Sequence, residues 1–267
     1  MKKNNYSDQH KKFLKNLSAN RYLALLTQIL VLILLLLSWE LLTYYNLIDG
    51  FLFSSPSRML LTVKDLYLSG ELFKHVGTTL YETILGFLIA TLLGTVIAVL
   101  LWWSDFIRKV FEPYVVVLNS LPKIALGPLI IIWFGAGTKS IIFMTVLVTV
   151  VVTIINILAG FSETDGEKIA LLKTMGASKL QVFLHLVMPS SIPSFISTLK
   201  INVGMSWIGS IMGEYLVSRQ GIGYLIVYGG QVFKLDLVMT GTVLLCVLAG
   251  LMYLFVAYLE KRLKGKR

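Results

Sequence analysis

Residues 140–162 read SIIFMTVLVTVVVTIINILAGFS, a run of 23 residues without a charged side chain. A helix needs about 20 largely apolar residues to cross the hydrocarbon core of a bilayer. Three other runs of similar length also lack charge, at 22–39, 83–104 and 237–259. We therefore expect at least four membrane-spanning helices.

Two further stretches are apolar but interrupted. Residues 114–133 contain two prolines and Lys123, and residues 190–213 contain one charge, Lys200, before Glu214 closes the stretch. If both are spans, the sequence predicts an all-α polytopic membrane protein with six transmembrane helices. The segment between the fourth and fifth spans would then be a cytoplasmic loop.

The composition of the whole chain agrees with this class. Of 267 residues, 56% are apolar and 14% charged, and the mean hydropathy is +0.79. A soluble globular domain carries about 25% charged residues, and a disordered chain combines low hydropathy with high charge. Both classes are excluded.

The net charge of +10 lies mostly in two tails. Residues 1–21 hold six basic side chains and one acidic, and residues 260–267 hold five basic and one acidic. Basic residues that flank spans favour the cytoplasmic side, and six spans place both tails on that side. A nucleic-acid-binding face would need its bases on a folded surface, so we expect no nucleic-acid partner.

The predicted organisation is a single membrane domain in the bacterial cytoplasmic membrane. Its expected parts are a cytoplasmic basic tail at 1–21, a first transmembrane helix at 22–42, an external loop with a short amphipathic helix at 43–75, a core of five transmembrane helices at 76–259, and a cytoplasmic basic tail at 260–267. The first span lacks the cleavage site of a signal peptide, so we expect it to remain as an anchor. Any ATPase or external receptor would be a separate chain.

Small residues recur at intervals of four on two spans. Such stripes let another backbone approach closely, either within the chain or at a subunit interface. The helix-packing candidates are Gly86, Ala90, Gly94 and Ala98 in the second span, with Gly209 and Gly213 in the fifth.

The third span contains the candidate translocation path. Pro122 and Pro128 remove helix hydrogen bonds, which membranes tolerate where a helix is buried in protein or lines a watery cavity. Lys123 between them indicates either a path-lining cation or a helix end whose ammonium snorkels to the interface. Asn119 and Glu214 complete the candidate set, and Arg219 could pair with Glu214.

The loop at 161–189 carries the signals of two short helices. Acids up to Glu167 begin the first helix, and Gly176 can adopt the left-handed conformation that ends it. Ser178 is a good N-cap for a second helix over 179–187, which Pro189 with Pro193 would break before the fifth span begins. A helix-turn-helix tethered between two spans suits docking to a cytoplasmic partner better than insertion into a DNA groove.

With these features, the chain resembles the permeases of binding-protein-dependent ABC importers, in particular the nitrate, sulfonate and taurine group. The family's loop pattern is E-A-A-x3-G with a proline thirteen residues later, which Gly176 and Pro189 match. Ala170, Leu171 and Leu172 occupy the E-A-A positions, so the glutamate is absent there and Glu167 lies about one turn earlier. Further similar stretches are Asn119-Ser120-Leu121-Pro122, Pro128 through Trp133-Phe134-Gly135, Glu214, and Gly221-Ile222-Gly223-Tyr224.

The resemblance implies a homodimeric channel with two cytoplasmic ATP-binding subunits and an external solute-binding protein. The coupling loop would include Glu167, Ala170, Leu171, Leu172, Gly176, Ala177 and Pro189. The chain would be a non-catalytic transport subunit without cofactor or metal, with ATP and Mg²⁺ bound by the partner. The sequence at 137–140 lacks the first glycine of a phosphate-binding loop, and Gly137 is not adjacent to Lys139. The three histidines have no metal-ligand spacing.

The transported solute has two candidates. The sulfonate-type resemblance and Lys123 favour a small oxyanion such as an aliphatic sulfonate, taurine or nitrate. The same branch also resembles importers of a thiamine pyrimidine precursor, a small heterocycle that is not anionic. From another class, a stand-alone secondary transporter or channel would show inverted repeats or several buried ionisable residues, and neither is seen.

Overall fold

The computed structural model describes residues 8–264, and all the regular structure within this range is helical. The prediction of an all-α membrane protein is thereby confirmed. The outermost bases of the two predicted tails, at 1–7 and 265–267, lie outside the described residues.

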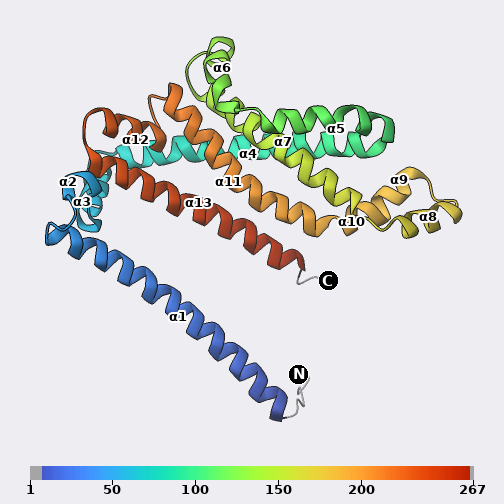
Figure 1. Ribbon diagram of the computed structural model, residues 1–267, viewed down its shortest axis with the longest axis horizontal. Helices are drawn as coiled ribbons and strands as arrows, with labels where there is room; N and C mark the ends of the chain where they lie inside the picture. Colours follow the sequence, from blue (N-terminus) through green and yellow to red (C-terminus); the bar gives the residue numbers. More distant parts are fainter. Residues whose placement is uncertain (1–7, 265–267) are drawn as a thin grey trace.

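The N-terminal helix stands apart from the others (Figure 1). This helix, α1 (Asp8–Tyr44), includes the first apolar run and is exposed along 22–37. It is followed by α2 (Gly50–Phe53) and by α3 (Pro56–Leu68), whose N-cap is Ser55. Glu40 of α1 accepts hydrogen bonds from the Ser57 N–H at 3.0 Å and the Ser57 hydroxyl at 2.8 Å, which ties α1 to the start of α3.

Four long helices form the bundle. They are α4 (Glu71–Trp103), α7 (Thr138–Ser162), α11 (Ile192–Val217) and α13 (Leu235–Lys264). The helix α7 packs between α4 and α11, and the shorter α12 (Ile222–Gln231) packs on α13. Much of α7 is buried, as expected for its apolar sequence, because other helices cover it on several sides.

The predicted third span differs from the observed structure. The helix begins earlier than expected, as α5 (Asp105–Ser120), and ends before Pro122. A 3₁₀ turn, η1 (Lys123–Leu126), and α6 (Gly127–Phe134) follow, bent by 86° from α5. Residues 114–133 are therefore not one straight helix, because Pro122 cannot continue the helical hydrogen bonds.

The loop between α7 and α11 contains α8 (Gly166–Thr174), α9 (Lys179–Val182), the π-helical turn η2 (Phe183–Val187) and α10 (Met188–Ser190). The expected break before the fifth span is present, but it comes just after Pro189: the helix continues to Ser190 and bends by 60° before Ile192. The π turn accommodates the proline: the Met188 N–H bonds to the Phe183 carbonyl, five residues back.

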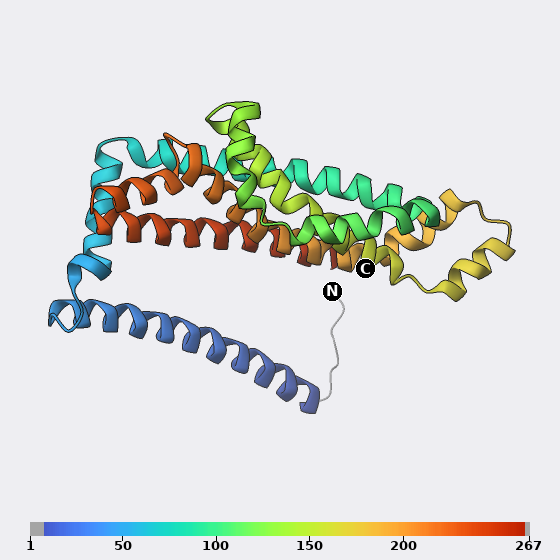
Figure 2. The ribbon, with the colours of Figure 1, turned by 45° about the horizontal axis from the view of Figure 1, so that its top comes forward.

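Different helices and connections lie at the two ends of the bundle. Within 8–264, four helices are long and apolar enough to cross a membrane, or up to six if each bent pair counts as one span. The start of α1, the end of α13 and the α8–α9 segment lie toward one end (Figure 2). The segments α2, α3 and α12 lie toward the other.

Candidate functional site

The loop at 161–189 projects from the bundle as two short helices joined by a tight turn. Asp165 caps α8 by accepting the Glu167 N–H at 3.0 Å, and this backbone hydrogen bond lowers the pKa of the Asp165 carboxyl. Gly176 has φ of +85°, a left-handed conformation that side chains with a Cβ disfavour. Ser178 and Gln181 then form a reciprocal capping box that starts α9.

The side chains of this loop divide into an inner and an outer set. Leu172 and Ala177 pack inward against the apolar cluster at the end of α4 and α7. Glu167, Ala170, Leu171 and Met175 face outward, and the fractional exposure is 60% for Leu171 and 75% for Met175. Pro189, the last residue of the predicted set, lies in α10 at the return to the membrane helices.

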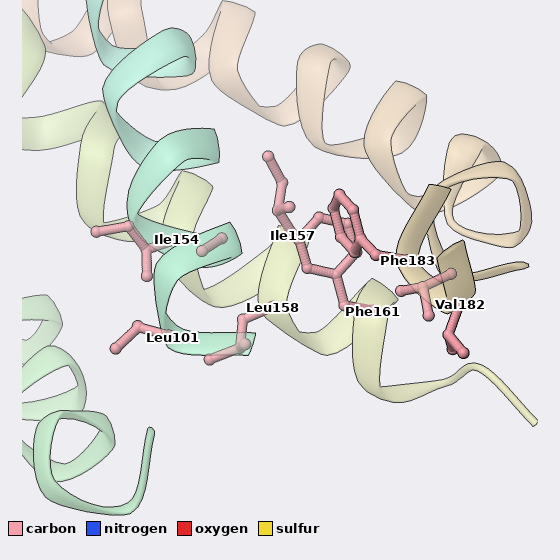
Figure 3. Packing of buried hydrophobic residues seen from close by; sticks show 9 residues of the cluster. Leu101, Ile154, Ile157, Leu158, Phe161, Val182 and Phe183 are labelled. Carbon is pink, nitrogen blue, oxygen red and sulfur yellow. The ribbon is translucent and has the colours of Figure 1, made fainter. Parts of the chain in front are cut away.

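The base of the loop is inserted into the bundle (Figure 3). Val182 and Phe183 are buried with Leu101 of α4 and Phe161 of α7. The Phe183 ring lies 5.6 Å from the Phe161 ring and 5.0 Å from the Trp102 ring, measured between centroids. Because interiors are close-packed, a displacement of α8 and α9 would be transmitted to α4 and α7.

The small residues lie where α7 meets its neighbours. A Cβ on Gly86 would come within 2.6 Å of Thr145 side-chain atoms, and one on Gly94 within 2.6 Å of Thr153. From the other side, Gly209 and Gly213 of α11 approach the α7 backbone at Thr145 and Ile141. Ala90 and Ala98 are fully buried on the same face of α4. Within this chain, the stripes thus serve the packing of α4 and α11 on α7.

The predicted path residues lie at the bend between α5 and α6. Asn119 lies in the last turn of α5, Pro122 precedes η1, and Lys123 begins η1. The Lys123 ammonium donates to the Asn119 carbonyl at 3.1 Å and is half-buried. The bend therefore brings these three residues together and leaves a cation beside an interrupted helix.

Glu214 lies elsewhere, near the C-terminal end of α11. Its carboxyl accepts the Thr79 hydroxyl at 2.6 Å and the Gly223 N–H at 2.5 Å. The suggested pairing with Arg219 is wrong, since the ion pairs of the described residues include none between these two. Instead, the carboxyl is satisfied by a hydroxyl of α4 and a backbone amide at the start of α12. Lys200, the one charge within 190–213, forms an ion pair with Glu260 of α13.

Sequence reasoning missed the α4 partners of Glu214. His75, Thr79 and Glu82 are buried polar residues in the first four turns of α4. The Nδ1 atom of His75 accepts the Gly221 N–H at 2.9 Å, and the Thr79 hydroxyl accepts the Ile222 N–H at 2.8 Å. The signal in the sequence was their spacing of three and four residues, which places polar side chains on one helix face.

These features define a class of protein: a multi-pass membrane protein whose small-residue helix packing supports a projecting helix-turn-helix. A family model for the inner membrane component of binding-protein-dependent transport systems matches residues 71–265. The chain belongs to this family, and it is the permease component of an ABC importer.

Relatives and solved structures agree with this assignment. An aliphatic sulfonates transport permease, SsuC of Bacillus subtilis, is 28% identical over 84% of this chain and 82% of its own length. The formylaminopyrimidine transport permease ThiX of Halalkalibacterium halodurans is 34% identical over 63% of this chain and 68% of its own. A bacterial alginate ABC transporter, solved in complex with an alginate pentasaccharide-bound periplasmic protein, matches with a TM-score of 0.62 and 16% identity, covering 92% of this chain and 96% of that one.

Proposed function

We propose that two copies of this chain form the translocation path of an ATP-driven importer, and that each α8–α9 loop docks on a cytoplasmic ATP-binding subunit. The observation that carries the proposal is the placement of apolar side chains along the loop. It presents Leu171 and Met175 outward at one end and buries Val182 and Phe183 in the bundle at the other. Exposed apolar side chains with a rigid base suit a partner that must push on the membrane helices.

The mechanism follows from this geometry. When the ATP-binding subunits close on ATP, they carry the docked loops with them. The cluster around Phe183 passes the motion to α4 and α7, and the spans tilt as rigid bodies between inward-open and outward-open states. ATP and Mg²⁺ stay in the partner subunits. An external binding protein delivers the solute, and the similar alginate transporter has been solved with a periplasmic protein that carries its pentasaccharide.

The docking proposal is tested with a pair of glycine variants. A Cβ added at Gly176 or Gly166 meets nothing within 4 Å, but only Gly176 has a positive φ. Gly176→Val should therefore reorient α9, and co-purification with the ATP-binding subunit and uptake should both fall. Gly166→Val is the matched control and should keep both.

Leu171→Glu, which alters the exposed surface alone, should weaken co-purification without lowering the amount of protein inserted in the membrane. Full co-purification of Gly176→Val and Leu171→Glu would refute docking at this loop.

We propose a small oxyanion, such as an aliphatic sulfonate, taurine or nitrate, as the solute. Lys123 supports this choice because it is the single charged residue of 113–138 and is half-buried at the bend of α5 and α6. A cation in a largely apolar path lowers the barrier for an anion. The similarity to the SsuC permease of Bacillus subtilis points the same way.

A second candidate is a small aminopyrimidine. The similarity to the ThiX permease, at 34% identity, favours it. A neutral heterocycle would not need Lys123, and the cation would then serve only to hold the Asn119 carbonyl.

The solute is identified with the cognate binding protein and with two Lys123 variants. Ligand at a hundredfold over its dissociation constant stabilises a protein by about 2.7 kcal/mol, so a thermal-shift screen detects it. We expect sulfonates, taurine or nitrate to stabilise the binding protein. Uptake should fall in Lys123→Met and persist in Lys123→Arg, with Lys139→Met as control. Stabilisation by an aminopyrimidine alone, with normal uptake in Lys123→Met, would replace the oxyanion by the second candidate.

A further inference from the structure

Two glutamates are fully enclosed in the bundle. Glu82 of α4 has a fractional exposure of 0% and Glu214 of α11 of 1%, and they are the buried acidic residues of the described range. Thr79, Glu82 and Thr83 occupy one face of α4, opposite Ser210 and Glu214 on one face of α11. Two hydrogen bonds between α4 and α11 fix this alignment. The Thr79 hydroxyl donates to Glu214 at 2.6 Å, and the Thr83 hydroxyl lies 2.7 Å from that of Ser210.

The two carboxyl groups differ in their partners. Glu214 accepts the Thr79 hydroxyl on one oxygen and the Gly223 N–H on the other, as an ionised carboxylate does. Neither oxygen of Glu82 receives a hydrogen bond from the donors of the described residues. The Glu82 carboxyl nevertheless neighbours the Glu214 carboxyl across the contact between α4 and α11.

The surrounding charges do not neutralise the pair. Within the described residues, no ion pair involves either glutamate. On α4, the Nδ1 atom of His75 accepts the Gly221 N–H, and its Nε2 atom lies 4.0 Å from Glu71. The charge of Lys74 also interacts electrostatically with the His75 ring. From α7, the neighbour of Glu82 is the uncharged Thr138, whose hydroxyl is a nearby donor but forms no hydrogen bond to either Glu82 oxygen by distance and angle.

The remaining titratable groups belong to α11, α12 and their connection. Tyr215 adjoins Glu214, and Tyr224 stacks on His75 at 6.0 Å between ring centroids. Arg219 lines the same 450 Å³ cavity as Glu82 without forming an ion pair with it. Two adjacent buried carboxylates without a cation would repel each other strongly.

We infer that Glu82 and Glu214 share one proton, with the protonated Glu82 donating to the ionised Glu214. This single proton gives Glu82 its missing hydrogen bond and leaves the pair with one negative charge, which the donors around Glu214 satisfy. It closes a clamp between α4 and α11 that also holds the α11–α12 turn, because Glu214 and Thr79 bind the amides of Gly223 and Ile222. Loss of the proton would place two like charges in this clamp and release the turn. This inference does not depend on the proposed solute or on the docking loop.

Infrared spectroscopy tests the proton directly. The full-length chain in a maltoside detergent, which has no carbonyl group of its own, should show the C=O stretching band of a protonated carboxylic acid at neutral pH, where exposed carboxyls are ionised. Glu82→Gln, which can donate to Glu214 through its amide, should lose this band. Glu71→Gln, on the same helix but exposed, should keep it. Absence of the band in the wild type, or its persistence in Glu82→Gln, would overturn the inference, and the wild-type spectrum decides even if the variant does not fold.

The pH dependence of stability gives a second readout. Above the pKa of an exposed glutamate, about 4.3, the unfolded state has released this proton while the folded state still holds it. Stability therefore falls as pH rises, by up to about a factor of ten in the unfolding equilibrium per pH unit, until the folded state releases the proton as well. Glu82→Gln removes the titrating group, and its thermal midpoint should fall less over this range than those of the wild type and Glu71→Gln. Equal falls in all three proteins would contradict the shared proton.

Discussion

Thr79 is the residue on which the contacts between α4 and the α11–α12 turn depend most. Its hydroxyl donates to Glu214 at 2.6 Å and accepts from the Ile222 N–H at 2.8 Å, and it is fully buried. If the hydroxyl were removed, both partners would lose a hydrogen bond in a place where water cannot replace it. A buried polar group without its partner costs about 1–3 kcal/mol.

Thr79→Val should therefore lower the free energy of unfolding by about 1–3 kcal/mol or more, although valine has nearly the same shape. Thr95→Val on the same helix is the control. The Thr95 hydroxyl bonds only to the Thr91 carbonyl one turn back, so its loss should cost little. Thermal unfolding of both variants in detergent gives the comparison, and equal midpoints would show that the Thr79 contacts contribute no stability.

At the scale of the helices, α7 is held between two glycine-bearing faces. Gly94 of α4 faces Thr153, and a Cβ there would lie 3.1 Å from the Val150 carbonyl, which is backbone and cannot rotate away. Gly77, near the start of the same helix, has nothing within 4 Å of its Cβ position.

These two glycines should respond to alanine with opposite signs. Gly94→Ala overpacks the α4–α7 contact and should destabilise by about 1–3 kcal/mol. Gly77→Ala should stabilise by about 0.5–1 kcal/mol, because alanine loses less backbone entropy in a helix. The thermal midpoints in detergent measure both shifts, and a gain in stability for Gly94→Ala would disprove close packing at this position.

The helices differ in how far sequence predicts them. Charge-free runs such as 140–162 have the length of a span and no competing structure, so composition and length suffice. The signals at Gly176 and Ser178 are equally local, since they concern the conformation and hydrogen bonds of single residues. The effect of Pro122 and of Pro189 could not be predicted from the sequence. The helix ends before Pro122, whereas a π turn carries the helix through Pro189, and only the tertiary context decides between these outcomes.

The buried cluster around Glu214 lies beyond sequence reasoning for a related reason. Glu82 and Glu214 are 132 positions apart, and their meeting depends on the packing of α4 and α11 against α7. The sequence shows a glutamate with a basic neighbour at Arg219, and the simplest local pairing is wrong. The backbone amide of Gly223 bonds to the carboxyl instead, and a backbone amide carries no side-chain signature in the sequence.

For the whole molecule, the arrangement of the two ends predicts a topology. The α8–α9 loop lies toward the same end as the start of α1 and the end of α13 (Figure 2), and the basic tails there favour the cytoplasm. In a protein with Cys246→Ser, Ser69→Cys between α3 and α4 should react with an impermeant thiol reagent in intact cells. Lys168→Cys on α8 should react only after permeabilisation. Both side chains are exposed, so the difference reports the side of the membrane. Equal reaction of the two in intact cells would exclude the topology.

The central claim is that this chain transports only when ATP-binding subunits act on it, and uptake in proteoliposomes tests it most directly. The chain is reconstituted alone, or together with its ATP-binding subunit and binding protein, and uptake of the solute identified with the binding protein is measured with and without ATP. We predict uptake only in the complete assembly with ATP, and its loss in Gly176→Val but not in Gly166→Val. Solute uptake by the chain alone, without ATP, would contradict this claim and indicate a stand-alone transporter.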